Sequence, residues 1–109
     1  MKRSKITKAI SNALKAISNA LKALPYSMES WIFGSEARGD AKENSDIDLL
    51  ILVDAPAVSS QVEDAIFSPL YQIELSTGIL INPLILPKSV WGSRVTPFYL
   101  NVTNERVRL

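Results

Sequence analysis

Two stretches decide the fold of this chain: IFGSEARGD at residues 32–40 and SDIDL at residues 45–49. The first begins as a short apolar strand and is broken at Gly34, where a helical turn can start. The second opens a mostly apolar run, residues 46–53, which is bounded by turn residues and predicts a buried strand. A glycine turn and a polar strand start are therefore expected close together in sequence and in space.

The second stretch carries two carboxylates at strand spacing. Side chains two residues apart in a strand point to the same face, so Asp46 and Asp48 are expected to lie side by side. Such a pair is costly without a cation, and carboxylate oxygens are ligands that Mg²⁺ prefers, usually together with water and substrate phosphates. The pair therefore predicts a site for a magnesium nucleotide.

The first stretch supplies groups that suit an anion. Gly34 lets the backbone approach a phosphate, and the turn that starts at Ser35 offers free N–H groups and a hydroxyl. Arg38 lies one helical turn later, where its guanidinium could bind phosphate or pair with a neighbouring acid. With the carboxylate pair, these residues indicate phosphoryl or nucleotidyl transfer, which depends mainly on positioning and charge neutralisation.

The composition limits the other possibilities. The chain has 109 residues, of which 47% are hydrophobic, so one compact domain with one site is expected. It contains neither cysteine nor histidine, which excludes disulfides, thiol nucleophiles, histidine bases and zinc sites of the usual kind. No apolar run approaches the roughly 20 residues of a membrane span. We therefore expect a cytoplasmic protein with no membrane association. Its net charge of +1 predicts no stable nucleic-acid partner.

The N-terminal residues 1–24 form a basic segment built on a repeat. The heptad KAISNAL occurs at residues 8–14 and again at 15–21, and no acid precedes Glu29. The apolar positions lie on one side of a helix and are Ile10, Leu14, Ile17, Leu21 and Leu24. This seam fits a helix that covers the sheet of its own domain or one that docks on a partner, and the sequence leaves both readings open.

The remaining segments predict alternating helices and strands. Residues 62–78 keep helical phase, with a kink or a restart expected at Pro69. Residues 79–86 predict a third strand, which Pro83 assigns to a sheet edge or a bulge. Thr96 and the following proline predict the start of a short helix that ends near residue 105. The fold class is therefore α/β, or α+β, with a three-to-four-stranded mixed sheet and helices packed on one face.

The stretches at residues 32–40 and 45–49 resemble the signature of the minimal nucleotidyltransferases of the DNA polymerase β superfamily. This resemblance implies that residues 25–109 form a domain that transfers a nucleoside monophosphate, AMP above all, from an NTP such as ATP with Mg²⁺ as cofactor. It implies that Gly34 and Ser35 hold the nucleotide phosphates and that Asp46 and Asp48 bind the metal. It also implies a HEPN-type helical partner protein, because many family members form toxin–antitoxin pairs with such proteins.

One position departs from the family pattern. Active members supply a third carboxylate from the strand after the long helix, where this chain has Asn82. An amide can ligate a metal weakly but cannot act as a base. We therefore expect nucleotide binding to persist, while transfer is slow, needs a residue from a partner, or is absent. The alternative function is a non-catalytic nucleotide-binding or partner-binding module. A second copy or a helical partner is expected to dock on the basic N-terminal helix or on the exposed edge strand.

Overall fold

The computed structural model describes residues 5–34 and 46–109 of the chain. In chain order its elements are α1 (Lys5–Lys22), β1 (Met28–Phe33), β2 (Ile47–Val53), α3 (Ser60–Thr77), β3 (Ile81–Pro87), α4 (Pro97–Glu105) and β4 (Val107–Arg108). Within these ranges, no helix has both the length and the apolar character needed to cross a membrane.

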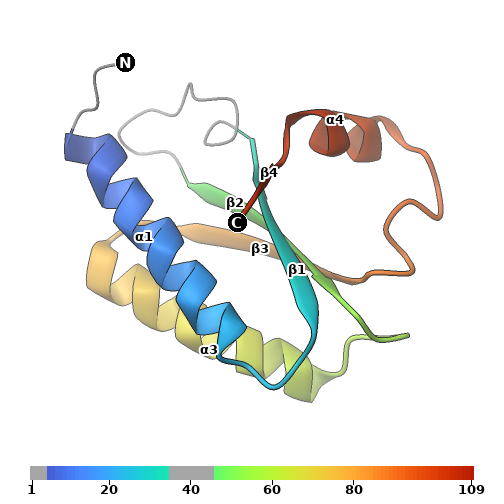
Figure 1. Cartoon of the computed structure of the whole chain (residues 1–109), viewed down its shortest axis with the longest axis horizontal. Coiled ribbons are helices and arrows are strands. Elements are labelled where there is room, and N and C mark those ends of the chain that lie inside the picture. Colours follow the sequence, from blue (N-terminus) through green and yellow to red (C-terminus); the bar gives the residue numbers. More distant parts are fainter. Residues whose placement is uncertain (1–4, 35–45) are drawn as a thin grey trace.

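The strands form one mixed sheet in the order β3-β2-β1-β4 (Figure 1). β1 pairs antiparallel with β2 and with β4, whereas β2 and β3 are parallel and are connected through α3. The predicted α/β class with a mixed sheet of three to four strands is therefore confirmed. The strand β4 was not predicted, because a two-residue strand has too little sequence pattern to be recognised.

Two helices cover one face of the sheet. The odd-numbered residues of β2, from Ile47 to Val53, are almost fully buried and share one cluster with inward residues of α1 and α3. On α1 the buried residues are Ile10, Ala13, Ile17 and Leu21. The apolar seam of the repeated heptad therefore packs against the sheet of its own chain, and only its polar side faces outward.

The helix α3 is continuous through its internal proline. Ser59 caps its start by accepting a hydrogen bond from the Val62 N–H at 3.2 Å, and Gly78 ends it in the left-handed conformation with a φ of 72°. The predicted restart at Pro69 is not observed, because the helix runs from Ser60 to Thr77 without a break. The buried residues Ile66, Leu70 and Ile73 lie on both sides of the proline and hold the helix on the sheet.

The shorter helix α4 lies against the opposite face. Thr96 caps it by accepting a hydrogen bond from the Tyr99 N–H at 3.1 Å, and Pro97 opens it, as predicted. Its buried Val102 packs with Leu50 and Leu52 of β2 in a second, smaller cluster. The expectation of helices on one face thus holds for α1 and α3 but not for α4, whose pattern of one buried residue was too weak to indicate a side.

The free edge of β3 has few hydrogen-bonding groups. The Leu80 carbonyl accepts a hydrogen bond from β2, and the Lys88 N–H donates one to β2. The even-numbered residues between them therefore also point their backbone N–H and C=O groups toward β2. The odd-numbered positions face outward, and two of them, Pro83 and Pro87, have no N–H. A third, the Ile81 N–H, donates to Glu74 Oε1 at 2.8 Å. This edge therefore offers few groups for pairing with an added strand, and Pro83 lies on an edge strand as predicted. The expected docking of a second copy or a helical partner at this edge stays a prediction.

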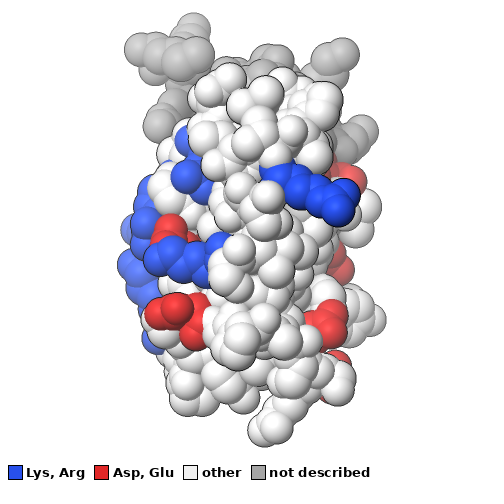
Figure 2. Space-filling model, turned by 90° about the vertical axis from the view of Figure 1, so that its right-hand side faces the viewer, with Lys and Arg blue, Asp and Glu red and all other residues white. Residues whose placement is uncertain are grey.

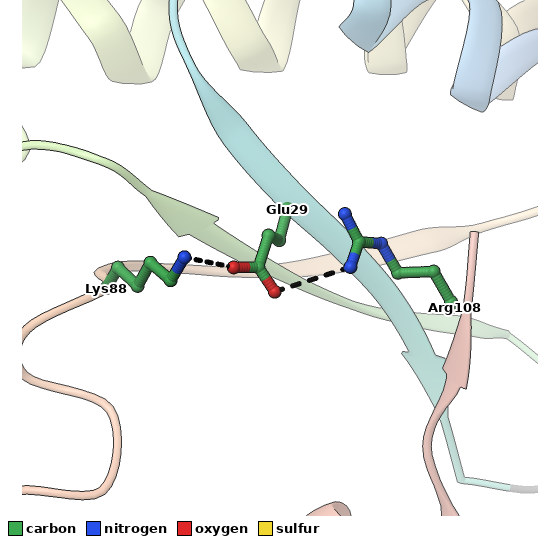
Figure 3. A network of polar contacts seen from close by, with 3 residues as sticks. All are labelled: Glu29, Lys88 and Arg108. Carbon is green, nitrogen blue, oxygen red and sulfur yellow. Dashed lines mark ion pairs between the residues drawn. The ribbon is translucent and has the colours of Figure 1, made fainter.

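A charged group ties three elements together at the other end of the sheet (Figure 3). The carboxylate of Glu29 on β1 contacts Lys88 Nζ at 2.5 Å and Arg108 Nη1 at 3.5 Å. The hydrogen bond from Lys88 holds the pKa of Glu29 below its usual value, and the same bond raises the pKa of Lys88. The guanidinium of Arg108 also lies over the Trp31 ring, 5.0 Å from its centroid.

Candidate functional site

The predicted acidic site lies where β2 begins. Asp48 is the second residue of β2 and stands in register with Phe33 of β1 on one side and Asn82 of β3 on the other. Paired residues of neighbouring strands point to the same face of a sheet. Asp48 and Asn82 therefore share the α4 face, and Asp46 directly precedes the strand.

The side chain of Asn82 joins both aspartates. Its Nδ2 donates a hydrogen bond of 3.0 Å to Asp46 Oδ2 and a longer one of 3.5 Å to Asp48 Oδ1. The structure thus brings together the three residues that the sequence singled out at this edge. Both aspartates are half-buried and Asn82 is exposed, so the group is open to a ligand from solvent.

This arrangement fits a hard divalent cation. The carboxylates of Asp46 and Asp48 both accept hydrogen bonds from the Asn82 amide NH₂, and the same carboxylate oxygens could bind one metal ion in its place. If the Asn82 amide turned over, its oxygen would face the same place and add a neutral ligand. In the described part of the chain, no third Asp or Glu joins them in a cluster able to hold a metal. The family's third carboxylate is therefore not replaced by another described acid.

The nearest alternative acid, Glu74, has a different partner. Its carboxylate accepts the hydrogen bond from the Ile81 N–H at the outer edge of β3, one residue before Asn82. Because it is half-buried and bonded, Glu74 helps to fix the start of β3. It contributes to the position of Asn82 and not to the aspartate pair.

The turn after β1 places Gly34 against the acidic pair. Gly34 has a φ of 74°, a left-handed conformation that other residues rarely adopt. A Cβ at this position would also collide with Asp48 Oδ2. Residue 34 is therefore required to be glycine both for its backbone and for the space that the carboxylate occupies.

The site includes one residue that the sequence analysis did not select. The Gly34 N–H donates to Oε1 of Glu105, the last residue of α4, at 3.1 Å. Glu105 comes close because β4 follows α4 at once and pairs with β1, which places Val107 beside Ile32. No local pattern could have found this contact, since the two residues are 71 positions apart in the chain.

Two predicted nucleotide-binding residues, Ser35 and Arg38, lie outside the described residues. Besides the carboxylates of Asp48 and Glu105, aromatic rings lie near the turn at Gly34. The ring of Phe33 meets that of Phe98 edge-on, with centroids 6.0 Å apart, and Phe98 is 49% exposed. The side of the molecule that carries α4 shows a mostly uncharged surface, on which Lys and Arg side chains lie apart from one another and Asp and Glu lie on both sides (Figure 2).

A hollow of about 260 Å³ lies elsewhere, between the end of α1 and the strands β1 and β4. Its lining includes Lys22, Tyr26 and Ser30 but none of the predicted site residues. Among the described residues, the acidic site is identified by its chemistry, since its carboxylates suit a ligand held through phosphates and a metal.

Comparison with known proteins agrees with the fold and the motif. Residues 14–81 match the family model of the nucleotidyltransferase domain. A Methanocaldococcus jannaschii protein, named provisionally as a protein adenylyltransferase, is 32% identical over 75 residues, which span 68% of this chain and 69% of that protein.

Two solved structures share the fold. A toxin–antitoxin structure determined with AMP-PNP superposes with a TM-score of 0.55 at 17% identity, covering 93% of this chain and 69% of the other. A Sulfolobus solfataricus protein, assigned provisionally as a nucleotidyltransferase, gives a TM-score of 0.50 at 18% identity, covering 99% and 89%. The family match extends over more than half of the chain, so this protein belongs to the nucleotidyltransferase domain family.

Proposed function

We propose that this protein transfers a nucleoside monophosphate, with AMP as the first candidate, from a magnesium NTP to a hydroxyl of a protein or small-molecule acceptor. The observation that carries the proposal is the convergence of Asp46, Asp48 and Asn82 beside the turn at Gly34. The relative named for protein adenylylation and the fold relative solved with AMP-PNP support ATP as the nucleotide.

In this proposal Asp46 and Asp48 hold Mg²⁺, which neutralises phosphate charge and orients the reacting groups when it is bound. Gly34 and Ser35 bind phosphate oxygens through the backbone, and Arg38 pairs with phosphate charge. A phosphate at the Gly34 N–H replaces Glu105 as its acceptor, because one N–H makes one strong hydrogen bond.

The transfer exchanges one bond for another. The acceptor oxygen forms a bond to the α-phosphorus, the bond from that phosphorus to the β-phosphate oxygen breaks, and pyrophosphate leaves. The acceptor hydroxyl also loses a proton. Asn82 cannot take it, since an amide is not a base near neutral pH, so the proton passes to water or to an acceptor-side group. We therefore expect slow transfer that speeds up when a carboxylate is placed at residue 82.

A second function is favoured by the same asparagine. Its amide already hydrogen-bonds both aspartates, which partly balances their charge in the absence of a cation. A site of this kind can bind a nucleotide without turning it over. The protein would then act as a nucleotide-dependent binding module for a partner, and Asn82→Asp would be needed to produce transfer.

Of the two acceptor classes in the leading proposal, the first to test is a partner protein, in a toxin–antitoxin pair in which this chain is the antitoxin. The support is the name of the curated relative and the toxin–antitoxin nature of the fold relative. A HEPN-type helical protein in the cytoplasm is the partner to test first. The exposed apolar side chains of Phe98 and Leu100 on α4 are a surface that a protein partner could cover.

The test is label transfer from each α-labelled NTP with Mg²⁺, with and without a candidate HEPN partner, followed on gels and by chromatography of small products. Asp46→Asn and Asp48→Asn are expected to lower transfer by at least about 100-fold. Asp54→Asn, which changes an exposed acid at the other end of β2, is the matched control and is expected to keep full activity.

The variant Asn82→Asp separates the two functions. If the wild type transfers slowly and Asn82→Asp is at least about tenfold faster, the leading proposal and the role of residue 82 both hold. If only Asn82→Asp transfers, the binding-module function is correct. Transfer by the wild type that is unaffected by either aspartate variant would contradict both.

A further inference from the structure

The outward surfaces of α1 and α3 have no role in the proposed function. The two helices lie side by side on one face of the sheet and run in opposite directions (Figure 1). Their inward sides fill the core, whereas the predicted site lies on the opposite face with α4. The helical layer is therefore a separate surface that the protein can use without blocking the aspartates.

The outward side of α1 is a basic stripe. Lys8, Lys15 and Lys22 recur every seven residues because of the repeated heptad, so they share one side of the helix, and all three are exposed. No acid occurs among residues 1–28. Packing against the sheet explains the apolar half of each repeat but not its basic half.

The outward side of α3 has the opposite character. Tyr71 and Leu75 are 57% and 63% exposed, and Asp64 lies on the same side, seven residues before Tyr71. Residues 54–87 contain no Lys or Arg. Large apolar side chains flanked by acids are a surface that lysine side chains can cover, with the aliphatic stems on the rings and methyl groups and the ammonium near the carboxylates.

We infer that this helical layer is the contact between two copies of the chain, in which α1 of each copy lies on α3 of the other. The two copies would be related by a two-fold axis that lies in the contact plane, parallel to the helices and midway between α1 and α3. This axis places α1 of each copy on α3 of the other, so that each contact is made twice. It keeps the helices antiparallel, so Lys22 of one copy meets the start of α3 in the other, where Asp64 lies. The basic and acidic surfaces of one chain thus complement each other only across the pair.

The size of the layer is adequate for such a contact. Two helices of 18 residues are each about 27 Å long and present a face roughly 20 Å wide. The flat projection of this face is about 540 Å², near the lower limit of roughly 600 Å² per partner for stable interfaces, and protruding side chains add to the area that is buried. Since the site faces away from the layer, both copies keep an accessible Asp46 and Asp48.

Sedimentation velocity of the purified full chain tests the contact directly. The wild type is expected to sediment as a species with twice the 12.0 kDa mass of one chain. The dimer is expected to dissociate more readily at about 1 M salt, where charges are screened beyond roughly 3 Å. Leu75→Glu is expected to raise the dissociation constant of the dimer by about tenfold or more. Leu100→Glu, an exposed leucine on α4, is the matched control and leaves the dimer intact.

A mixing experiment tests the charge pairing without relying on one variant. Lys22→Glu and Asp64→Lys are each expected to be monomeric, because like charges then face each other twice. An equal mixture of the two restores the dimer, since each Glu then meets a Lys across the contact. A monomeric wild type, dissociation by Leu100→Glu in place of Leu75→Glu, or a mixture that stays monomeric would overturn the inference.

Discussion

The two faces of β2 differ in composition and in burial. Toward α1 and α3, every residue that the strand contributes is apolar and almost fully buried, from Ile47 to Val53. Toward α4, the strand begins with Asp48 and only then contributes Leu50 and Leu52 to a smaller cluster. One strand thus serves as the centre of the core and as the support of the predicted site.

This difference shows how a small domain can hold an acidic pair in place. The large cluster and the pairing with β1 and β3 fix the backbone of β2, so the position of Asp48 does not depend on the thin layer around α4. The thin layer leaves the same face open to solvent and to a ligand. Rigidity comes from one side of the strand and access from the other.

The strongest test of this comparison truncates one buried side chain in each of the two hydrophobic clusters. Ile51→Ala removes a fully buried side chain from the larger cluster and is expected to lower the free energy of unfolding by about 3 kcal/mol. Val102→Ala on the α4 side is expected to cost about 2 kcal/mol, because it removes two buried carbon atoms in place of three, from a smaller cluster. Urea denaturation of both variants measures the difference, and equal losses would show that the faces support the fold equally.

A second test concerns the close approach at the site. Gly34→Ala is expected to lower the free energy of unfolding by about 2 kcal/mol, because alanine is strained at a φ of 74° and its Cβ meets Asp48. Gly78→Ala is the matched control, since Gly78 has a φ of 72° but nothing lies within 4 Å of the added carbon. It is expected to cost about 1 kcal/mol. If both variants lose the same amount in denaturation curves, the contact with Asp48 carries no energy.

A third test asks whether the neighbouring charges of Asp46 and Asp48 lower the stability of the folded protein. Asp48→Asn removes one of two neighbouring charges while keeping an oxygen for the Asn82 amide, and is expected to raise the free energy of unfolding by about 0.5 kcal/mol in the absence of Mg²⁺. Added Mg²⁺ is expected to raise the Tm of the wild type more than that of the variant. A variant that is less stable without metal would mean that the pair is not strained.

The smallest effect is expected from the charged group at the far end of the sheet. Glu29→Gln is expected to lower the Tm by no more than about 3 °C at neutral pH, as for other partly exposed ion pairs. The lowered pKa of Glu29 means that its contribution is present above the ordinary glutamate pKa and is lost as the pH falls through the lowered value. Thermal unfolding of both proteins should therefore converge in acid, and a difference that persists there would contradict the assignment.

Most of the fold could be predicted from the sequence because its patterns are local. The heptad seam, the apolar run of β2 and the Thr96–Pro97 start of α4 each carry a periodicity or a cap that depends on neighbouring residues. The pairing of Asp48 with Asn82 was anticipated only through the resemblance to a family. Parallel strands joined through a helix have no turn that fixes their register.

The features that could not be predicted depend on distant residues. The side of the sheet that α4 covers follows from the packing of Val102, and the contact of Glu105 with Gly34 follows from the pairing of β4. The continuity of α3 through Pro69 is another case, since buried residues on both sides outweigh the loss of one hydrogen bond. In each case tertiary contacts decided between local alternatives.

The proline-bearing edge of β3 also affects how the chain behaves when it is crowded or newly made. An open sheet offers its edge to other unfolded or partly folded chains, and the apolar sequence of residues 79–86 would otherwise favour stacking into fibrils. Pro83 and Pro87 interrupt any such ladder in every copy, including before α3 has docked. We therefore expect the two prolines to limit aggregation at the concentrations at which the inferred dimer would form.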